Sequence, residues 1–349
     1  METNNPKHIL VIRLSAMGDV AMVVPVLMAL YNAYPELRIT ILTKDFFKPI
    51  LEQIPNVTVY KADVKGKHKG FFGLWSLFLE LKSLNIDAVA DLHNVLRSNI
   101  LKKFFLLYRI PFYQIDKGRP EKKALTAKHN KIFENLKPMH ERYADVFRLL
   151  GFSFQLTKEH VYSKSILEQE VTLKLGLKSK KLIGIAPYAA FIGKRYPLNL
   201  MEKVVKTLSE LEDYQILLFG GGDKEQMQLE QWSAAHNNCV SVPGKITFLE
   251  ELKVISNLNV MLSMDSGNAH LAAMYGVPVV SIWGVTHPYA GFYPYGQDKN
   301  NALLSNRDLY PLIPTSVYGN KVPEGYENAM ETITPEQIVD KIKSVLNIF

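Results

Sequence analysis

Three turns in the sequence combine glycine with residues that can transfer protons or bind anions. The first has the sequence RLSAMGD, at residues 13–19. Asp19 directly follows Gly18, where a helix is expected to begin. A carboxylate in that position stabilises a helix N-terminus by about 0.3–1 kcal/mol. It can equally act as a general base towards a bound hydroxyl group. The spacing alone leaves both roles open.

The second turn has the sequence MDSGNAH, at residues 264–270, and follows an apolar run. Asp265 or Ser266 can cap the helix that is expected next. Gly267 lets the backbone approach a ligand closely, and the N–H groups at a helix start bind anions. His270 lies one turn further along the same helix. The pattern predicts either an ordinary helix cap or an anion site.

The third turn spans residues 186–197 and contains Gly193 followed by Lys194 and Arg195. Cations in a loop of this kind can bind the oxygen atoms of a pyrophosphate. Two solvated cations on a surface loop are the alternative interpretation.

Several common nucleotide motifs are missing from the sequence. It contains no D-x-D pair, no G-x-x-x-x-G-K-[ST] loop and no G-x-G-x-x-G after the first apolar run. The nearest glycine-rich stretch is GGGD at residues 220–223. Bound phosphates would therefore interact with backbone N–H groups and with Lys or Arg. We expect neither a metal ion nor a cofactor.

The elements that position these turns alternate between strand and helix. Strands are expected at residues 8–14, 38–43, 57–60 and 88–91, and then at 182–186, 215–219, 239–242, 260–263 and 277–283. Helical patterns lie between them, including one at residues 20–34 and a polar one at 163–176 that connects the two halves. This alternation is typical of βαβ units around parallel sheets. The sequence predicts two doubly wound α/β domains, residues 1–165 and 166–334, and a C-terminal helix at 335–349. Ligands are expected at the carboxyl ends of the strands, in a cleft between the domains.

Composition narrows the class of protein. The 349 residues are 47% hydrophobic and 21% charged, as in globular proteins. The one cysteine, Cys239, excludes an internal disulfide and fits a reducing compartment. Charged residues interrupt the first apolar run, and no apolar stretch reaches the roughly 20 residues that span a bilayer. We therefore expect the protein to remain in the cytoplasm.

The positive charge is concentrated in one segment. Residues 97–142 contain twelve Lys and Arg against four Asp and Glu, whereas the whole chain has a net charge of +7. Such a segment indicates a binding surface for an anionic membrane, an acidic substrate or nucleic acid. The alternative is a solvated surface that binds no partner. No helix-turn-helix, zinc or aromatic-stacking motif accompanies it, so we expect no nucleic acid.

Together, the turns resemble glycosyltransferase family 9, the lipopolysaccharide heptosyltransferases. DLHNVLRS at residues 91–98, GKRYP at 193–197 and FGGGDKE at 219–225 add to the resemblance. The resemblance implies a GT-B fold, in which two Rossmann-like domains face each other across a cleft. The first domain would bind the acceptor, and the second the nucleotide sugar.

The resemblance also implies roles for individual residues. Asp19 matches the catalytic base, and Arg97 matches a basic residue that meets an acceptor phosphate, with Lys102 of the basic segment beside it. The matches to the donor site are Lys194, Glu225, Asp265, Ser266, Gly267 and His270. Ala189 and Ala190 stand where relatives often have hydroxyl residues, which leaves the sugar and the nucleotide base open.

The function expected on this basis is an inverting, metal-independent transfer of heptose from ADP-heptose to a lipopolysaccharide core or related glycolipid. The enzyme would associate peripherally with the inner face of the cytoplasmic membrane. The same fold could instead use another nucleotide sugar in O-antigen or capsule assembly. A nucleotide-dependent oxidoreductase is disfavoured by the missing dinucleotide motif. A silent nucleotide-binding module is disfavoured by the combination of Asp19 and Lys194.

Overall fold

The computed structural model describes residues 6–178 and 181–348, and the chain forms two units. Unit 1 comprises Met1–Lys117 and Pro138–Val161, and unit 2 comprises Gly118–Lys137 and Tyr162–Phe349. The chain therefore passes from one unit to the other three times. The sequence predicted one boundary between the two α/β domains, after residue 165, whereas in the structure residues 118–137 group with unit 2.

Unit 1 contains a five-stranded parallel sheet with the order β3-β2-β1-β4-β5. The strands are β1 (His8–Ile12), β2 (Arg38–Thr43), β3 (Val57–Lys61), β4 (Ala88–Asp91) and β5 (Phe112–Gln114). The central strand β1 is buried along its whole length, as its uninterrupted apolar sequence predicts for a parallel sheet covered on both faces.

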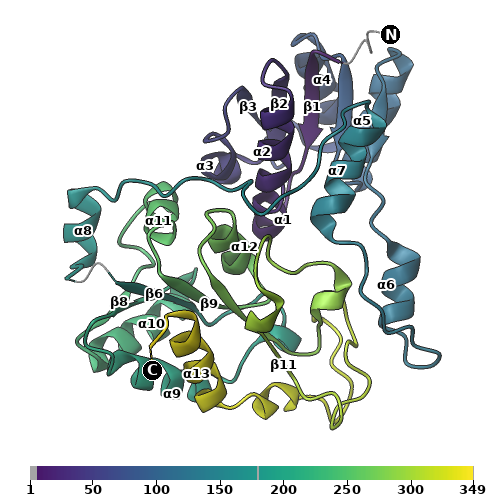
Figure 1. Ribbon diagram of the computed structural model, residues 1–349. Helices are drawn as coiled ribbons and strands as arrows, with labels where there is room; N and C mark the ends of the chain where they lie inside the picture. The colour runs from purple at the N-terminus through teal and green to yellow at the C-terminus, as the bar shows by residue number, and fades with distance from the viewer. Residues whose placement is uncertain (1–5, 179–180, 349) are drawn as a thin grey trace. The chain divides into compact units, whose positions relative to one another are not determined.

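The helices of unit 1 connect these strands, except α7, which follows the last strand (Figure 1). They are α1 (Met17–Ala21), α2 (Val24–Ala33), α3 (Lys48–Leu51), α4 (Gly70–Lys82), α5 (Leu96–Leu107) and α7 (Met139–Leu149). The sequence predicted one helix over residues 20–34, but α1 and α2 are separate. Pro25 lies in the first turn of α2, where its missing N–H costs no helical hydrogen bond.

Unit 2 contains a six-stranded parallel sheet with the order β11-β10-β9-β6-β7-β8. The strands are β6 (Leu182–Ala186), β7 (Gln215–Leu218), β8 (Cys239–Ser241), β9 (Val260–Met264), β10 (Val279–Trp283) and β11 (Ala302–Leu304). The strand order reverses between β6 and β9. In doubly wound sheets, such a switch point opens a crevice at the carboxyl ends of the strands.

Helices cover both faces of this sheet (Figure 1). The helices of unit 2 are α6 (Arg119–Leu125), α8 (Gln169–Leu175), α9 (Leu198–Ser209), α10 (Asp223–Ala235), α11 (Phe248–Ile255), α12 (Gly267–Ala273) and α13 (Pro335–Val345). Helices α9, α10 and α13 share one hydrophobic core with the strands. Helices α11 and α12 lie on the opposite face.

The helix predicted over residues 163–176 is shorter than expected, because α8 begins only at Gln169. The residues before it form hydrogen bonds with the end of α11 instead. The N–H of Ser165 donates to Ser256 Oγ at 3.1 Å, and its carbonyl accepts from Asn257 Nδ2 at 2.9 Å. These tertiary hydrogen bonds replace the helical ones.

Within the described residues, no helix is long and apolar enough to cross a membrane. The same residues contain no cluster of three or more His, Cys, Asp and Glu that could bind a metal ion.

Candidate functional site

The second and third turns meet in unit 2 through a buried ion pair. Asp265 follows β9, and Lys194 ends a short 3₁₀ helix after β6 (Ile192–Lys194). Lys194 Nζ lies 2.7 Å from Asp265 Oδ2, and the two side chains are 16% and 5% exposed. Thr286, which follows β10, donates its hydroxyl to the same carboxylate oxygen at 2.9 Å. Three neighbouring strand ends therefore converge on Asp265.

This arrangement compensates a charge that would be costly to bury alone. Asp265 does not cap α12, because its carboxylate binds Lys194 and Thr286 instead. The Lys194 ammonium group has three donors. It can therefore bind a phosphate oxygen while it remains paired with Asp265.

Three glycines allow the backbone around Lys194 to pack this closely. Gly319 has a φ of +79°, and a Cβ atom there would lie 2.5 Å from Lys194 Cγ. The N–H of Gly193 donates to the Gly319 carbonyl at 3.1 Å. A Cβ atom on Gly284 would lie 2.2 Å from the Gly193 carbonyl oxygen. Sequence reasoning missed Gly319, since it lies in no recognisable motif.

Arg195 and Lys194 have different roles, although they are adjacent in the sequence. Arg195 Nε donates to the carbonyl of Ala189 at 2.7 Å, and Nη2 donates to that of Ala190 at 3.4 Å. Arg195 therefore closes the loop after β6. Lys194 is the cation of this pair that reaches the carboxylate at the switch point.

The remaining donor-site predictions lie at the carboxyl ends of the strands of unit 2. Ser266 precedes α12 and places its Oγ 3.0 Å from Ser263 Oγ instead of capping the helix. Gly267 is the first helical residue, and His270 is buried one turn later. The N–H groups that open α12 thus have no side-chain cap from Ser266.

Glu225 lies in the first turn of α10, after β7. Its Oε2 accepts from the N–H of Gly221 at 2.9 Å, which fixes the glycine turn. Burial and the charge of Glu225 raise the pKa of Tyr188, in the loop after β6, to about 12. The two side chains therefore lie near each other at adjacent strand ends, and Glu225 Oε1 remains as an acceptor for a ligand hydroxyl group.

In unit 1, Asp19 is paired with an arginine that sequence reasoning did not single out. Asp19 Oδ2 lies 2.5 Å from Arg13 Nη2, and the side chains are 25% and 6% exposed respectively. The N–H of Ala16 donates to the same oxygen at 3.2 Å. Arg13 Nη1 donates to the carbonyl of Leu92, after β4, at 2.6 Å. An arginine at the end of a buried strand was the available signal for this pair.

His93 lies beside this pair, after β4. Its Nδ1 accepts from the N–H of Leu14 at 3.4 Å, and its Nε2 lies 3.4 Å from Ser15 Oγ. Burial, followed by the charge of Arg13, lowers the pKa of His93 to about 3. The ring is therefore neutral near pH 7, and it supports the turn that leads to Asp19.

The two predicted acceptor residues lie on α5 in different environments. Arg97 is exposed in the first turn. Lys102 Nζ donates to Gln114 Oε1 at 2.7 Å, and Gln114 Nε2 donates to Asp91 Oδ2 at 2.8 Å. Lys102 thus connects α5 to β5, whereas Arg97 extends into solvent.

The sequence model of glycosyltransferase family 9 (heptosyltransferase) matches residues 74–313 of this chain. The chain belongs to this family. Among curated relatives, lipopolysaccharide core heptosyltransferase OpsX of Haemophilus influenzae is 23% identical, covering 82% of this chain and 81% of the relative. Lipooligosaccharide heptosyltransferase 2 of Haemophilus ducreyi is 26% identical, covering 97% and 99%.

Solved structures agree on the fold of this glycosyltransferase. A family 9 glycosyltransferase from Veillonella parvula superimposes with a TM-score of 0.74 at 22% identity, covering 98% of this chain and 97% of that structure. Escherichia coli ADP-heptose LPS heptosyltransferase II gives a TM-score of 0.69 at 20% identity, with 97% and 98% covered. The GT-B prediction, with two parallel-sheet α/β domains, is confirmed.

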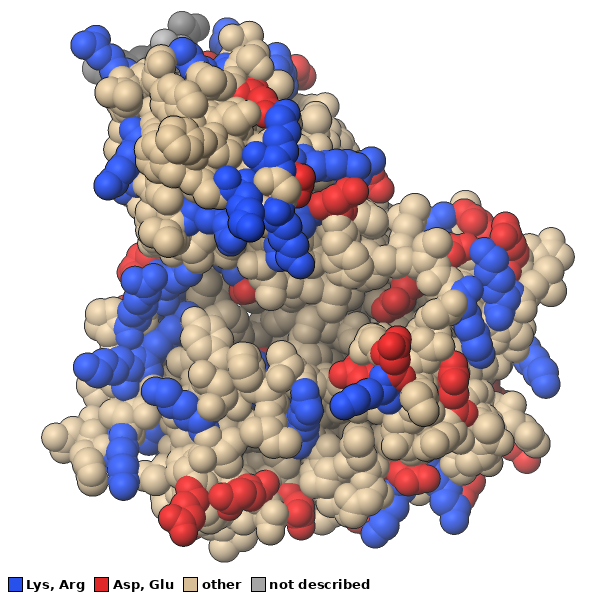
Figure 2. All heavy atoms as spheres, turned by 180° about the vertical axis from the view of Figure 1, so that it is seen from behind, with Lys and Arg blue, Asp and Glu red and all other residues tan. Residues whose placement is uncertain are grey.

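The basic segment of the glycosyltransferase is divided between the units. Residues 118–137, which we name the strap, belong to unit 2. Phe133 lies 3.4 Å from the Arg307 guanidinium and 5.0 Å from the His287 ring. Lys131 Nζ donates to the carbonyl of Pro314 at 2.8 Å. Figure 2 shows Lys and Arg side chains gathered on the side where α6 lies.

The charges of the strap are less exposed than the sequence suggests. Lys122 is buried, and its Nζ lies 4.4 Å from the centre of the Phe292 ring. Burial and the charge of Arg307 lower the pKa of Lys131 to about 8. These two lysines fasten the strap to unit 2 of the glycosyltransferase and are poor candidates for binding an anionic surface.

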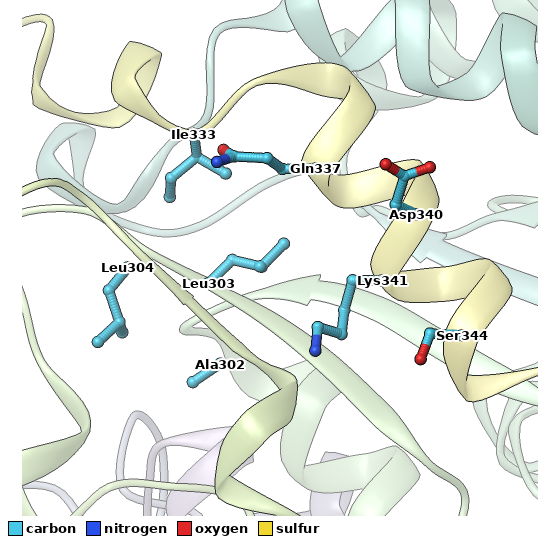
Figure 3. A pocket seen from close by; sticks show the side chains of 8 residues that line it. All are labelled: Ala302, Leu303, Leu304, Ile333, Gln337, Asp340, Lys341 and Ser344. Carbon is cyan, nitrogen blue, oxygen red and sulfur yellow. The ribbon is translucent and has the colours of Figure 1, made fainter.

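A separate hollow of about 530 Å³ lies between β11 and α13 of the glycosyltransferase (Figure 3). Its walls include Leu303 and Leu304 on one side and Gln337, Asp340 and Lys341 on the other. No predicted site residue lines this hollow.

Proposed function

We propose that this glycosyltransferase transfers heptose from ADP-heptose to a lipopolysaccharide core or related glycolipid, with inversion and without a metal ion. The observation that carries the proposal is the pair between Lys194 and Asp265 at the switch point of unit 2. The names of relatives that span nearly the whole chain support the substrate class.

Unit 2 is proposed to bind the nucleotide sugar. Lys194 and the N–H groups that open α12, at Ser266 and Gly267, would bind the diphosphate, and Glu225 the ribose. Negative charge develops on the diphosphate as the bond to the sugar breaks. Donors that are already in position stabilise that charge without reorganisation, which is the usual source of catalysis in such sites. Asp265 and His270 would hold the donor loop in position.

Unit 1 is proposed to bind the acceptor, with Arg97 at an acceptor phosphate and Asp19 as the general base. Asp19 removes the proton of the acceptor hydroxyl, and that oxygen attacks the anomeric carbon from the face opposite the nucleotide. The bond between the anomeric carbon and the diphosphate oxygen breaks, and its electron pair leaves with ADP. Arg13 holds the Asp19 carboxylate in position throughout.

The glycolipid acceptor places the reaction at a membrane. We propose a cytoplasmic enzyme that associates peripherally with the inner face of the inner membrane. The positive charge of the chain supports this location, since each Lys or Arg near an anionic surface contributes about 1 kcal/mol.

The test is transfer by the purified chain from ADP-heptose to a lipid A–core acceptor in the presence of EDTA. We expect product by mass spectrometry, with inverted anomeric configuration by NMR. A strict requirement for a divalent metal, or retention of configuration, contradicts the mechanism. If kcat/KM is higher with another nucleotide sugar than with ADP-heptose, that sugar is the donor, and the reaction is still a glycosyl transfer.

A further inference from the structure

Helices α4 and α5 of unit 1 pack side by side and expose large apolar side chains. The most exposed are Phe72 at 85%, Leu107 at 72% and Phe71 at 59%. We name the whole set the α4–α5 face; its members are Phe71, Phe72, Leu79, Leu106, Leu107 and Tyr108. The apolar run of α5 is visible in the sequence at residues 104–107, whereas no sequence pattern singled out the two phenylalanines of α4.

Ring contacts connect the aromatic members of this face through Phe104 and Trp75. The Phe72 ring lies 5.8 Å from that of Phe71, which lies 5.5 Å from the ring of Phe104. Trp75 lies 5.0 Å from Phe104 and 6.5 Å from Tyr108. Single exposed apolar residues are common on proteins, whereas a continuous group marks an interaction surface.

Positive charge surrounds the face. Residues 65–82 and 96–109 contain eight Lys and Arg and one acidic residue, Glu80. Lys67 Nζ lies 2.7 Å from Glu80 Oε1, so this acid is already paired. Besides Lys67, the exposed cations are Lys65, Lys69, Lys82, Arg97, Lys103 and Arg109. In Figure 2, the surface of unit 1 likewise shows a tan area with blue side chains along its borders.

We propose that the α4–α5 face docks unit 1 onto an anionic lipid bilayer. Phe72 and Leu107 enter the interface between headgroups and acyl chains, while Lys69 and Lys103 bind the headgroups. Exposed aromatic and aliphatic side chains beside lysines are the combination that binds such an interface. A symmetric dimer through this face would bring like charges together, which disfavours a second copy as the occupant.

The proposal deepens the proposed function and rests on its glycolipid acceptor. Arg97 lies in the first turn of α5 and Leu107 is its last residue. The ten residue steps from Arg97 to Leu107 correspond to about 15 Å along the helix axis. One helix therefore carries both the proposed acceptor-phosphate residue and the docking residue, so docking brings Arg97 near an acceptor that is anchored in the same bilayer.

The experiment measures sedimentation of the full chain with vesicles of phosphatidylglycerol and phosphatidylethanolamine. The variant Phe72→Ser, Leu107→Ser leaves the contact between Phe71 and Phe104 intact. It should lose at least about tenfold in vesicle affinity, since burying one such side chain contributes more than that factor. The variant Lys69→Gln, Lys103→Gln should lose about fivefold for each cation.

The matched control is Ile166→Ser, Leu173→Ser in unit 2, whose side chains are 86% and 71% exposed. It should bind vesicles as the unaltered chain does. Unchanged vesicle affinity in the Phe72→Ser, Leu107→Ser variant overturns the proposal, as does an equal loss in the control. The proposal is also overturned if the unaltered chain binds neutral phosphatidylcholine vesicles as tightly as anionic ones. The same holds if the Phe72→Ser, Leu107→Ser variant loses self-association but still binds vesicles.

Transfer to a water-soluble, delipidated acceptor separates this proposal from the proposed function. All three variants should retain that activity, whereas transfer to acceptor embedded in vesicles should fall in the two α4–α5 variants. A chain that binds vesicles through this face but transfers nothing to either acceptor refutes the proposed function alone.

Discussion

Asp19 and Asp265 are both carboxylates at strand-to-helix turns, but their surroundings suit different tasks. Asp265 is 5% exposed and is bound by Lys194 and Thr286. Asp19 is 25% exposed and is held on one side by Arg13. A general base must reach the proton that it removes. The more exposed Asp19 meets that requirement, whereas Asp265 is suited to positioning Lys194.

Asp19→Asn should lower the transfer rate by about 10²–10⁴-fold, the usual contribution of a general base. Affinity for ADP should stay the same, because the nucleotide is assigned to unit 2. Steady-state kinetics and calorimetry measure the two effects. Asp45→Asn, which removes another paired carboxylate of unit 1, is the control and should keep full activity. Turnover of Asp19→Asn within tenfold of the unaltered enzyme would refute the base assignment.

Lys194→Ala should weaken ADP binding by about 1.5–3 kcal/mol, the contribution of a hydrogen bond to a charged group. It also leaves Asp265 buried without its cation, which lowers stability. The double variant Lys194→Met, Asp265→Asn removes that buried charge. It should therefore be more stable than Lys194→Ala but should bind ADP no more tightly. Calorimetry together with thermal unfolding distinguishes the two effects. ADP affinity equal to that of the unaltered chain would locate the phosphates elsewhere.

At the scale of elements, the sequence predicted the alternation of strands and helices and the turns that carry Asp265 and Lys194. Parallel strands bring their carboxyl ends to one edge, so these predictions needed only local patterns. The sequence could not predict that Gly319 lies under Lys194. Their contact depends on an irregular loop after β11, where neither periodicity nor a motif reports the partner. Segment 163–168 was wrongly predicted as helix for a related reason: its hydrogen-bond partners lie just after the end of α11.

Gly319→Ala should raise the Kd for ADP about tenfold, because the added Cβ displaces the Lys194 side chain. Gly325→Ala is the matched control. Gly325 has a φ of +80°, so alanine is strained at both positions, but no atom lies within 4 Å of a Cβ added at Gly325. Both variants should lose about 1–2 kcal/mol of stability from the left-handed backbone. Equal ADP affinity in the two variants would show that Gly319 does not position Lys194.

Helix α11 carries a titratable group that should make stability depend on pH. Burial raises the pKa of Glu251 to about 7, whereas an unfolded glutamate titrates near 4.5. Between these values the folded state holds a proton that the unfolded state releases. Rising pH in this window therefore favours unfolding.

Urea unfolding at pH 5 and pH 8 tests this dependence. The unaltered chain should lose about 1–3 kcal/mol of its free energy of unfolding between pH 5 and pH 8, and Glu251→Gln should abolish this loss. Glu202→Gln, an exposed position on α9, should leave the loss in place. An identical pH dependence in the unaltered chain and in Glu251→Gln would contradict the prediction.

At the scale of the whole molecule, the charge of residues 97–142 was visible in the sequence, but its division between two units was not. The strap joins unit 2 through contacts of Phe133 with His287 and Arg307, residues far along the chain. Local composition carries no information about such partners. The buried Lys122 shows the same limit, since charge alone suggested a surface position.

The strap also limits which segments can be exchanged between family members to make a folded chimera. A chimera joined at residue 161 would take its first half from one parent and carry that parent's strap onto the other parent's unit 2. Phe133 would then meet unfamiliar residues in place of His287 and Arg307. Productive recombinants should therefore inherit residues 118–137 together with 162–349, as two discontinuous pieces from one ancestor. The segment that must be exchanged as a whole is therefore not one contiguous half of the gene.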